Sequence, residues 1–230
     1  MEDGNGKGDD SYFKTAFLER VAHELRGPAG VIHGALQELE VALGQQAGEH
    51  EVFLAMAKRG LKRILRTADR LQTAGQLERS APALSLSSCD LSALVRQAVN
   101  DAQAIEGRKK VTVDVQLPSA PVQCLIDPHW MGMALFELAS NAIRHSHERA
   151  EVTLSSRDGG YDVTFTDDAR TSVEFGPTRF RPSRDGRGLG LGLSTVQDVI
   201  AAHGGALHTD YGRTSGQSFG ARVSLTIPAA

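Results

Sequence analysis

The segment Gly186–Val196 reads GRGLGLGLSTV and has a glycine at every second position from Gly186 to Gly192. Glycine destabilises both helices and strands, so this stretch predicts a loop whose backbone amides are not covered by side chains. A helix is expected to begin at Ser194, directly after the loop, and free N–H groups at a helix start bind phosphate oxygens. The regular alternation with leucine favours a phosphate-binding loop over a merely flexible one.

A second segment, Phe136–Ser146, reads FELASNAIRHS and is predicted to be helical. Glu137 and Asn141 are four residues apart and therefore share one face of the helix. The amide oxygen of Asn141 is a suitable ligand for Mg²⁺ bound to a triphosphate, and Arg144 is placed to contact phosphate. A plain amphipathic helix also contains such residues, so this segment indicates a nucleotide site only together with the glycine-rich loop.

A third segment, Phe17–Pro28, reads FLERVAHELRGP. His23 is two residues from the apolar Val21 and from Leu25, which turns it about 200° away from the apolar stripe of a helix and predicts that it is exposed. Glu24 can hydrogen-bond the imidazole and fix its tautomer, which leaves the other ring nitrogen nucleophilic near neutral pH. The alternative is an ordinary surface histidine beside a surface glutamate.

Around these segments the chain divides into a helical part and a mixed part. Residues 11–80 carry apolar residues at helical spacing, interrupted at residues 44–48 (GQQAG), and predict two helices in an antiparallel hairpin. One hairpin cannot bury both sides of its apolar stripe, so we expect a homodimer that forms a four-helix bundle. Residues 1–10 are Gly-rich and acidic and are predicted to be a disordered lead-in, and residues 81–88 are predicted to be a linker.

Residues 89–230 alternate between helical and strand-like patterns. Helices are expected at residues 91–106, 129–145 and 194–203, and strands at residues 111–117, 122–126, 152–156, 161–166, 206–210 and 221–227. Mainly antiparallel strands with several helices predict an α+β fold with one layer of each.

Composition excludes several classes of protein. With 40% hydrophobic and 23% charged residues, the chain is not wholly disordered. The net charge of −3 argues against nucleic-acid binding, and no apolar stretch approaches the roughly 18–20 residues of a membrane span. Cys89 and Cys124 have no metal-ligand spacing, so we expect thiols in the cytoplasm, with no membrane contact from this chain itself.

The three segments together resemble the catalytic core of two-component sensor histidine kinases, in the same order and at similar intervals. HELRGP resembles the phosphoacceptor box, FELASNAIRHS the asparagine box and GRGLGLGLSTV the second glycine box; CDLSALV, Asp127 and SGQSFGARVSLTIP also fit. The resemblance implies a dimerisation hairpin followed by an α/β sandwich ATP-binding domain of the Bergerat type over residues 89–230. It also implies ATP-dependent autophosphorylation of His23, with Glu24 as its base partner, and transfer of the phosphoryl group to an aspartate of a response regulator.

The cofactors implied by the resemblance are ATP and Mg²⁺, with Asn141 as the metal ligand and Asp167 as the acceptor for the adenine amino group. The remaining nucleotide-binding residues implied are Glu137, Arg144, Gly188, Gly190, Leu191 and Gly192. A run of basic residues on the second helix is a candidate surface for an acidic response regulator: Lys58, Arg59, Lys62, Arg63, Arg66 and Arg70. Taken one at a time, these residues are more typical of a solvated helix face.

The chain departs from the family pattern after Asp167. The family has glycines in the first glycine box where this chain has Ala169 and Thr171, and each added Cβ is expected to narrow the approach to the nucleotide and weaken ATP binding. This departure leaves an alternative function open. In that alternative the chain is a degenerate kinase that acts as a dimeric interaction or phosphotransfer module with weak or no ATP binding.

Overall fold

The computed structural model describes residues 6–44, 47–106, 111–169, 191–210, 212 and 219–228, and within its helices it leaves out the side chains of residues 6–17, 19, 20, 24 and 47–51. The chain divides into two compact units, Met1–Ser80 and Ala81–Ala230. Each unit is described by itself below.

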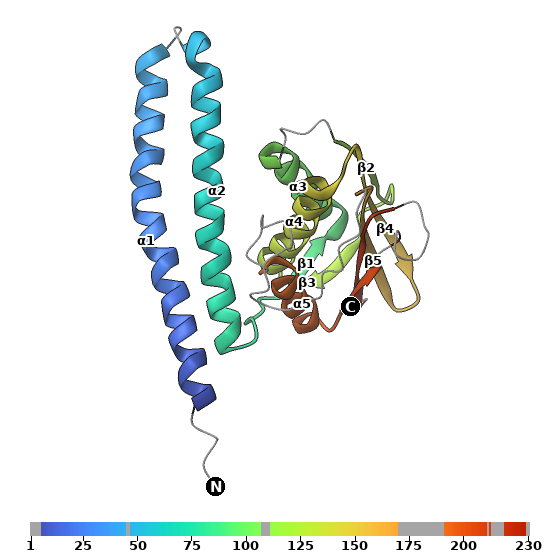
Figure 1. The fold of residues 1–230 in the computed structure, drawn as a ribbon. Coiled ribbons are helices and arrows are strands. Elements are labelled where there is room, and N and C mark those ends of the chain that lie inside the picture. Colours follow the sequence, from blue (N-terminus) through green and yellow to red (C-terminus); the bar gives the residue numbers. More distant parts are fainter. Residues whose placement is uncertain are drawn as a thin grey trace. The chain divides into compact units, whose positions relative to one another are not determined.

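The first unit is an antiparallel pair of long helices, α1 (Gly6–Leu43) and α2 (Ala47–Arg79), shown in Figure 1. Gly44 directly follows α1 with a φ of 46°, a left-handed conformation in which glycine commonly ends helices. Arg26 of α1 forms an ion pair with Asp69 of α2 at 2.5 Å and also donates to Gln72, and Lys58 of α2 pairs with Glu40. These cross-links fix how the two helices are aligned along their length.

The interior of the hairpin is built largely from small and medium apolar side chains. Leu54, Leu61 and Ala68 follow one another at intervals of seven residues on α2 and are all buried. On α1 the buried residues Ala22 and Ala29 have the same spacing of seven. A seven-residue apolar repeat is typical of helices that pack along a common seam, which explains why these two segments associate.

The helix α1 begins five residues earlier than expected. Residues 1–10 were predicted to be a disordered lead-in, but Gly6–Asp10 belong to α1, and residues 1–5 lie outside the described part of the chain. Extending an existing helix costs far less than nucleating one, because each added residue gains a hydrogen bond.

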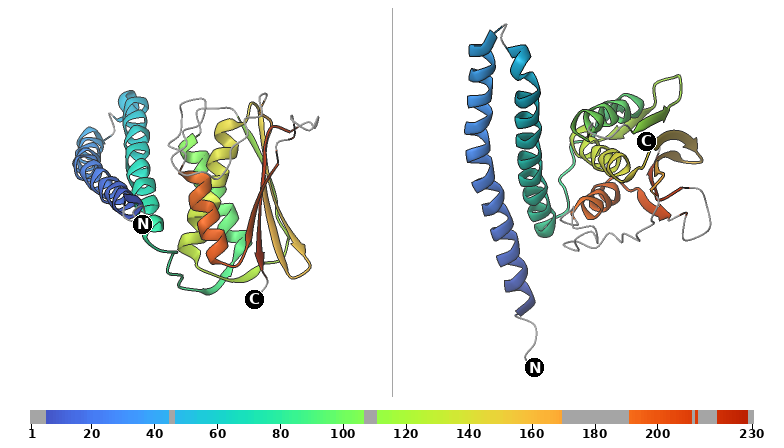
Figure 2. Two further views of the ribbon diagram at one scale, coloured as in Figure 1. Left: turned by 60° about the horizontal axis from the view of Figure 1, so that its bottom comes forward. Right: turned by 45° about the horizontal axis from the view of Figure 1, so that its top comes forward.

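In its described residues, the second unit contains a five-stranded sheet, a two-stranded sheet and three helices. The large sheet has the order β2 (Thr112–Gln116), β4 (Arg149–Arg157), β5 (Gly160–Asp167), β7 (Arg222–Pro228), β6 (Ala206–Asp210). Only the β2–β4 pair is parallel within the described sheet. The small sheet pairs β1 (Ser87–Asp90) with β3 (Gln123–Ile126). The helices α3 (Leu91–Glu106), α4 (Pro128–His145) and α5 (Gly192–Ala202) cover one face of the large sheet (Figure 2).

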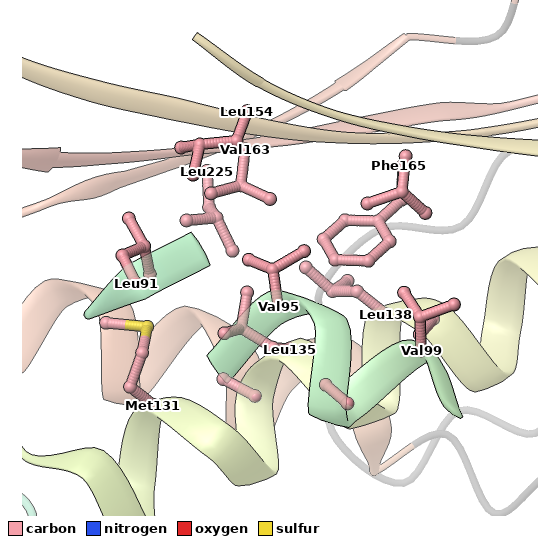
Figure 3. Packing of buried hydrophobic residues seen from close by; sticks show 14 of the residues in the cluster. Leu91, Val95, Val99, Met131, Leu135, Leu138, Leu154, Val163, Phe165 and Leu225 are labelled. Atoms are coloured by element: carbon pink, nitrogen blue, oxygen red, sulfur yellow. The ribbon is translucent and has the colours of Figure 1, made fainter. Parts of the chain in front are cut away.

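The core of this unit lies between the helices and the sheet (Figure 3). Alternate residues of the central strands face the helices, as in Val163 and Phe165 of β5, and are buried. Opposite them lie buried residues of the helices, such as Val95 of α3 and Leu135 and Leu138 of α4. The side-chain alternation of β5 therefore sets which of its residues point toward the helix layer.

The predicted α+β class is confirmed, with a helical hairpin followed by an α/β sandwich. Strand β1 was not predicted, and its first two residues, Ser87 and Ser88, had been assigned to the linker. A strand of four residues with no apolar alternation gives little signal in a sequence, since its pairing with β3 supplies the stabilisation. Among the described helices, none is long and apolar enough to cross a membrane.

Candidate functional site

Helix α4 carries three of the predicted site residues. Asp127 caps its N-terminus, where Oδ1 accepts hydrogen bonds from the backbone N–H groups of His129 and Trp130 at 2.9 and 3.0 Å. Three turns further along, Glu137 is buried at 5% exposure, and Asn141 and Arg144 follow it. The guanidinium of Arg144 donates to Oδ1 of Asn141. The oxygen predicted to bind Mg²⁺ is thus in contact with the side chain predicted to bind phosphate.

The start of helix α5 lies against this part of α4. A Cβ placed on Gly192 would be 3.0 Å from Oε2 of Glu137 and 3.7 Å from Nδ2 of Asn141. Glu137 therefore places its carboxylate beside the first residue of α5, where the N-terminal end of the helix dipole stabilises negative charge. Leu191, the residue before α5, is buried, and its carbonyl accepts from the Ser194 hydroxyl at 3.0 Å. Gly188 and Gly190 lie outside the described residues.

Asp167 ends β5 on the face that turns toward the helices, two residues beyond the buried Phe165. Its Oδ1 accepts from the backbone N–H groups of Ala169 and Ala221, both at 3.0 Å. Oδ2 has no hydrogen-bond partner among the described residues. Burial raises the pKa of the Asp167 carboxyl above its usual value and the charge of Asp168 adds to this, although the two backbone hydrogen bonds act in the opposite direction.

Asp168 connects the end of β5 to the end of α4. Its Oδ1 accepts from the backbone N–H of His147 at 2.7 Å, and its Oδ2 from those of Glu148 and Arg149, both at 3.1 Å. These amides directly follow α4, which ends at His145, about one turn beyond Asn141. The carboxylate of Asp168 therefore holds the end of β5, with Asp167, next to the end of α4, with Asn141.

The Ala169 methyl group is accommodated by a glycine on the opposite segment. A Cβ placed on Gly220 would be 2.7 Å from the Ala169 Cβ and 2.4 Å from Asp167 Oδ1. The absence of a side chain at Gly220 thus provides the space that the methyl group occupies, which weakens the expectation that Ala169 narrows the site. Thr171, the second departure from the family pattern, lies outside the described residues.

In the first unit, His23 is exposed on α1, as its position in the sequence predicts. Its neighbour Ala22 is buried at 1% exposure. Consecutive residues of a helix are about 100° apart around its axis, so His23 lies outside the buried face that contains Ala22. Arg26, three residues further on, holds this part of α1 to α2 through its ion pair with Asp69. The side chain of Glu24, the predicted base partner, lies outside the described part of the chain.

Two residues of the second unit hold the elements of the site together through hydrogen bonds that the sequence did not predict. Asp168 was not singled out, yet its carboxylate accepts from the backbone N–H groups of three residues that follow α4. The sequence predicted no role for His203, but its ring Nε2 accepts from the backbone N–H of Asp127 at 3.0 Å. Neither interaction has a sequence pattern, because both join segments that are far apart in the chain.

These contacts fit a nucleotide with its metal. Gly192 leaves open the space beside Glu137 and Asn141, Asp167 keeps one carboxylate oxygen unpaired among the described residues, and Arg144 provides positive charge. The family of histidine kinase-, DNA gyrase B-, and HSP90-like ATPases matches residues 126–230, which include all of these positions. Residues 126–230 therefore resemble this ATPase family.

Sensor histidine kinases are similar to the chain over nearly all of its length. Sensor protein QseC of Escherichia coli K12 is 26% identical over 216 residues, covering 90% of this chain and 46% of QseC. Sensor-like histidine kinase SenX3 of Mycolicibacterium smegmatis is 26% identical over 226 residues, covering 92% of this chain and 56% of SenX3. The chain thus spans about half the length of these two relatives and 15% of hybrid signal transduction histidine kinase D of Dictyostelium discoideum.

Solved structures with the same fold extend the likeness beyond the ATPase domain. Full-length ShkA in complex with AMPPNP has a TM-score of 0.66 at 22% identity, covering 94% of this chain and 46% of ShkA. Histidine kinase AdeS of Acinetobacter baumannii has a TM-score of 0.57 at 22% identity, covering 90% of this chain and 98% of that chain. The predicted resemblance to a histidine kinase catalytic core is confirmed.

Proposed function

We propose that the chain is the catalytic core of a two-component sensor histidine kinase, which phosphorylates its own His23 and passes the phosphoryl group to an aspartate of a response regulator. The observation that carries the proposal is the contact of Gly192 with Glu137 and Asn141 in an ATPase domain, in a chain whose helical hairpin exposes a histidine followed by glutamate. Asp167 lies in the same domain and supplies the acceptor proposed for the adenine amino group.

Each site residue has a separate task in this proposal. Asp167 accepts the adenine amino group at Oδ2, because its Oδ1 is already held by the amides of Ala169 and Ala221. Asn141 holds Mg²⁺ through its amide oxygen, and Arg144 then leaves that oxygen and contacts phosphate. Bound ATP with Mg²⁺ supplies the phosphoryl group and neutralises its charge.

His23 acts as the nucleophile through one ring nitrogen. The exposed imidazole must present an unprotonated nitrogen, and Glu24 is assigned to hold the proton on the other one. The ion pair of Arg26 with Asp69 keeps the helix that carries His23 aligned with α2. The residues of the hairpin therefore orient the acceptor, and those of the ATPase domain bind the donor.

The hairpin is proposed to form a homodimer. Large apolar side chains remain exposed on the single hairpin, with Val31 at 74%, Val41 at 79% and Phe53 at 69% exposure. All of the exposed large hydrophobic residues of the described hairpin lie between residues 31 and 64, in the half next to the loop that joins the helices: Val31, Ile32, Leu39, Val41, Val52, Phe53, Met56 and Ile64. A second copy that pairs with this surface completes a four-helix bundle.

The response regulator is proposed to bind the basic surface of α2. Lys62 and Arg63 are exposed there, whereas Lys58 pairs with Glu40 and Arg59 is half-buried. Exposed positive side chains steer an acidic partner toward the hairpin that carries His23. Lys58 and Arg59 are therefore less accessible to a partner than the basic run in the sequence suggests.

Incubation with γ-labelled ATP and Mg²⁺ tests the proposal. The label is expected on the protein as an acid-labile, base-stable phosphoramidate, and His23→Ala should abolish it. His33→Ala is the matched control, because His33 is also exposed on α1, ten residues further on. Asn141→Ala should prevent labelling while leaving the hairpin intact. Labelling that persists in His23→Ala, or that His33→Ala also removes, would overturn the assignment of His23.

A further inference from the structure

Helix α5 ends in a rigid backbone arrangement that fixes the position of His203. The N–H of Gly204 donates to the Ala201 carbonyl and that of Gly205 to the Ile200 carbonyl, both at 2.9 Å, which is the hydrogen-bond pattern of a Schellman motif. Gly204 has a φ of 72°, a conformation that side chains other than glycine rarely adopt. A Cβ on Gly205 would lie 2.1 Å from the Thr226 carbonyl oxygen, so the backbone has no room to shift there.

The two ring nitrogens of His203 have partners of opposite kind. Nδ1 lies 2.7 Å from the carbonyl oxygen of Val199, which can only accept, so Nδ1 carries the proton. Nε2 accepts from the backbone N–H of Asp127 at 3.0 Å and must therefore be unprotonated. The two bonds together require the neutral Nδ1–H tautomer.

Asp127 joins this histidine to two other segments. Its Oδ1 caps α4, and its Oδ2 accepts from the backbone N–H of Ser85 at 2.7 Å, in the segment that leads from the unit boundary at Ser80 to β1. Burial raises the pKa of the Asp127 carboxyl, but the hydrogen bonds from Ser85, Trp130 and His129 outweigh it and hold the pKa below its usual value. The carboxylate is thus ionised and fully engaged at neutral pH.

The helices α4 and α5 run in opposite directions and are connected at both ends. At one end Gly192 lies against Glu137 and Asn141, and at the other His203 bonds to Asp127. Between them, Val196, Val199 and Ile200 of α5 are buried in the core. A helix of this length is about 16 Å long and moves as a rigid body, so a displacement of Gly192 also displaces His203.

We propose that His203, as the neutral Nδ1–H tautomer, is a positioning residue that ties the distal ends of the two nucleotide-site helices to the segment entering the ATPase unit through Asp127 and Ser85. It touches neither nucleotide nor phosphate and acts through the placement of α4 and α5. We call the hydrogen bonds that join His203, Asp127 and Ser85 the junction. The effect of His203 on nucleotide binding rests on the proposed kinase function, whereas the existence of the junction does not.

Three variants of the full chain test the junction without reference to activity. His203→Ala removes the acceptor, and His203→Gln supplies a side-chain oxygen that can replace Nε2 as an acceptor. His208→Ala is the matched control, because His208 is an exposed histidine of the neighbouring β6. Hydrogen exchange of the peptides that contain Ser85 and Asp127 is the readout. Exchange should be about tenfold faster in His203→Ala, close to wild type in His203→Gln and unchanged in His208→Ala.

A second readout examines the tautomer in the wild-type chain. In protein labelled with ¹⁵N-histidine, the signal that disappears in His203→Gln should be that of a neutral ring protonated at Nδ1. A charged ring, an Nε2–H tautomer, or unchanged exchange in His203→Ala would overturn the proposal. Because this measurement needs no alanine variant, it still decides the matter if His203→Ala does not fold.

The nucleotide readout separates this inference from the proposed function. Affinity for AMPPNP with Mg²⁺ should fall by about three- to tenfold in His203→Ala and recover in His203→Gln. If wild type binds no nucleotide while the exchange results are as expected, the kinase proposal fails and the junction stands. If wild type binds and His203→Ala binds equally well, His203 does not position the site.

Discussion

The methyl group of Ala169 lies directly opposite Gly220, where a Cβ at position 220 would be only 2.7 Å from the Ala169 Cβ. The same Cβ would be 2.4 Å from Asp167 Oδ1 and 2.6 Å from the backbone nitrogen of Ala169. The segment after β5 and the segment before β7 therefore share one space, and the glycine of the second makes room for the alanine of the first. The alanine that departs from the family pattern at position 169 is thus accommodated by the absence of a side chain at Gly220.

Gly220→Ala is expected to weaken ATP binding at least about tenfold, because the new Cβ must displace the carboxylate assigned to adenine. Ala169→Gly should change the affinity less than about threefold, since the methyl group already has its space. Titration calorimetry of both variants with AMPPNP measures the difference. A large gain in affinity for Ala169→Gly would show instead that the alanine obstructs the site.

Asp167→Asn is expected to abolish nucleotide binding while leaving the fold as stable as wild type or more stable at pH 7. The amides of Ala169 and Ala221 still need an acceptor, so the asparagine oxygen takes the place of Oδ1 and its NH₂ group then faces the adenine amino group. Two donors facing one another cannot hydrogen-bond.

The stability effect follows from the raised pKa of Asp167. When the pKa of a carboxyl is higher in the folded state, the folded state binds the proton more tightly, so stability is lost as the pH rises through that pKa. Asparagine has no such loss. Thermal unfolding at pH 7 should therefore favour Asp167→Asn relative to wild type, and the advantage should shrink toward acidic pH, below the ordinary carboxyl range. A variant much less stable than wild type at pH 7 would contradict this.

Asp168→Ala is expected to destabilise the second unit by about 1–3 kcal/mol, because the backbone N–H groups of His147, Glu148 and Arg149 lose their acceptor. Asp168→Asn should lose less, since one oxygen remains. Urea unfolding followed by circular dichroism measures both. Asp158→Ala, in the turn between β4 and β5, serves as the control and should have little effect. Equal stability of Asp168→Ala and wild type would remove the assigned role.

The sequence predicted most of the elements because the apolar spacing of each is locally readable. The helix α3 and the strand β6 begin and end at the residues expected, and the alternation of Val163, Phe165 and Asp167 already orients the aspartate toward the helices. The exposure of His23 also follows from its position between Val21 and Leu25. These are properties of one element at a time.

Contacts between elements could not be predicted in the same way. The bonds of Asp168 to residues 147–149 and of His203 to Asp127 join side chains to backbone amides 19 or more residues away. A backbone amide has no residue identity, so no pair of residue types signals such a contact. The space that Gly220 leaves for Ala169 could not be predicted either, because a glycine in the sequence does not indicate which residue occupies the space beside it.

The proposed homodimer gives the last prediction. Ile64 lies on α2 at 42% exposure in the single hairpin, within the group of exposed apolar side chains between residues 31 and 64. Ile64→Glu would bury an unpaired carboxylate in a four-helix bundle, at a cost of several kcal/mol, and should convert the dimer to monomer in sedimentation velocity. Gln76→Glu adds the same charge at an exposed polar position of the same helix and should leave the dimer intact. Binding of AMPPNP by Ile64→Glu should remain, because the nucleotide residues lie in the second unit. A dimer that withstands Ile64→Glu would place the interface on another surface of the hairpin.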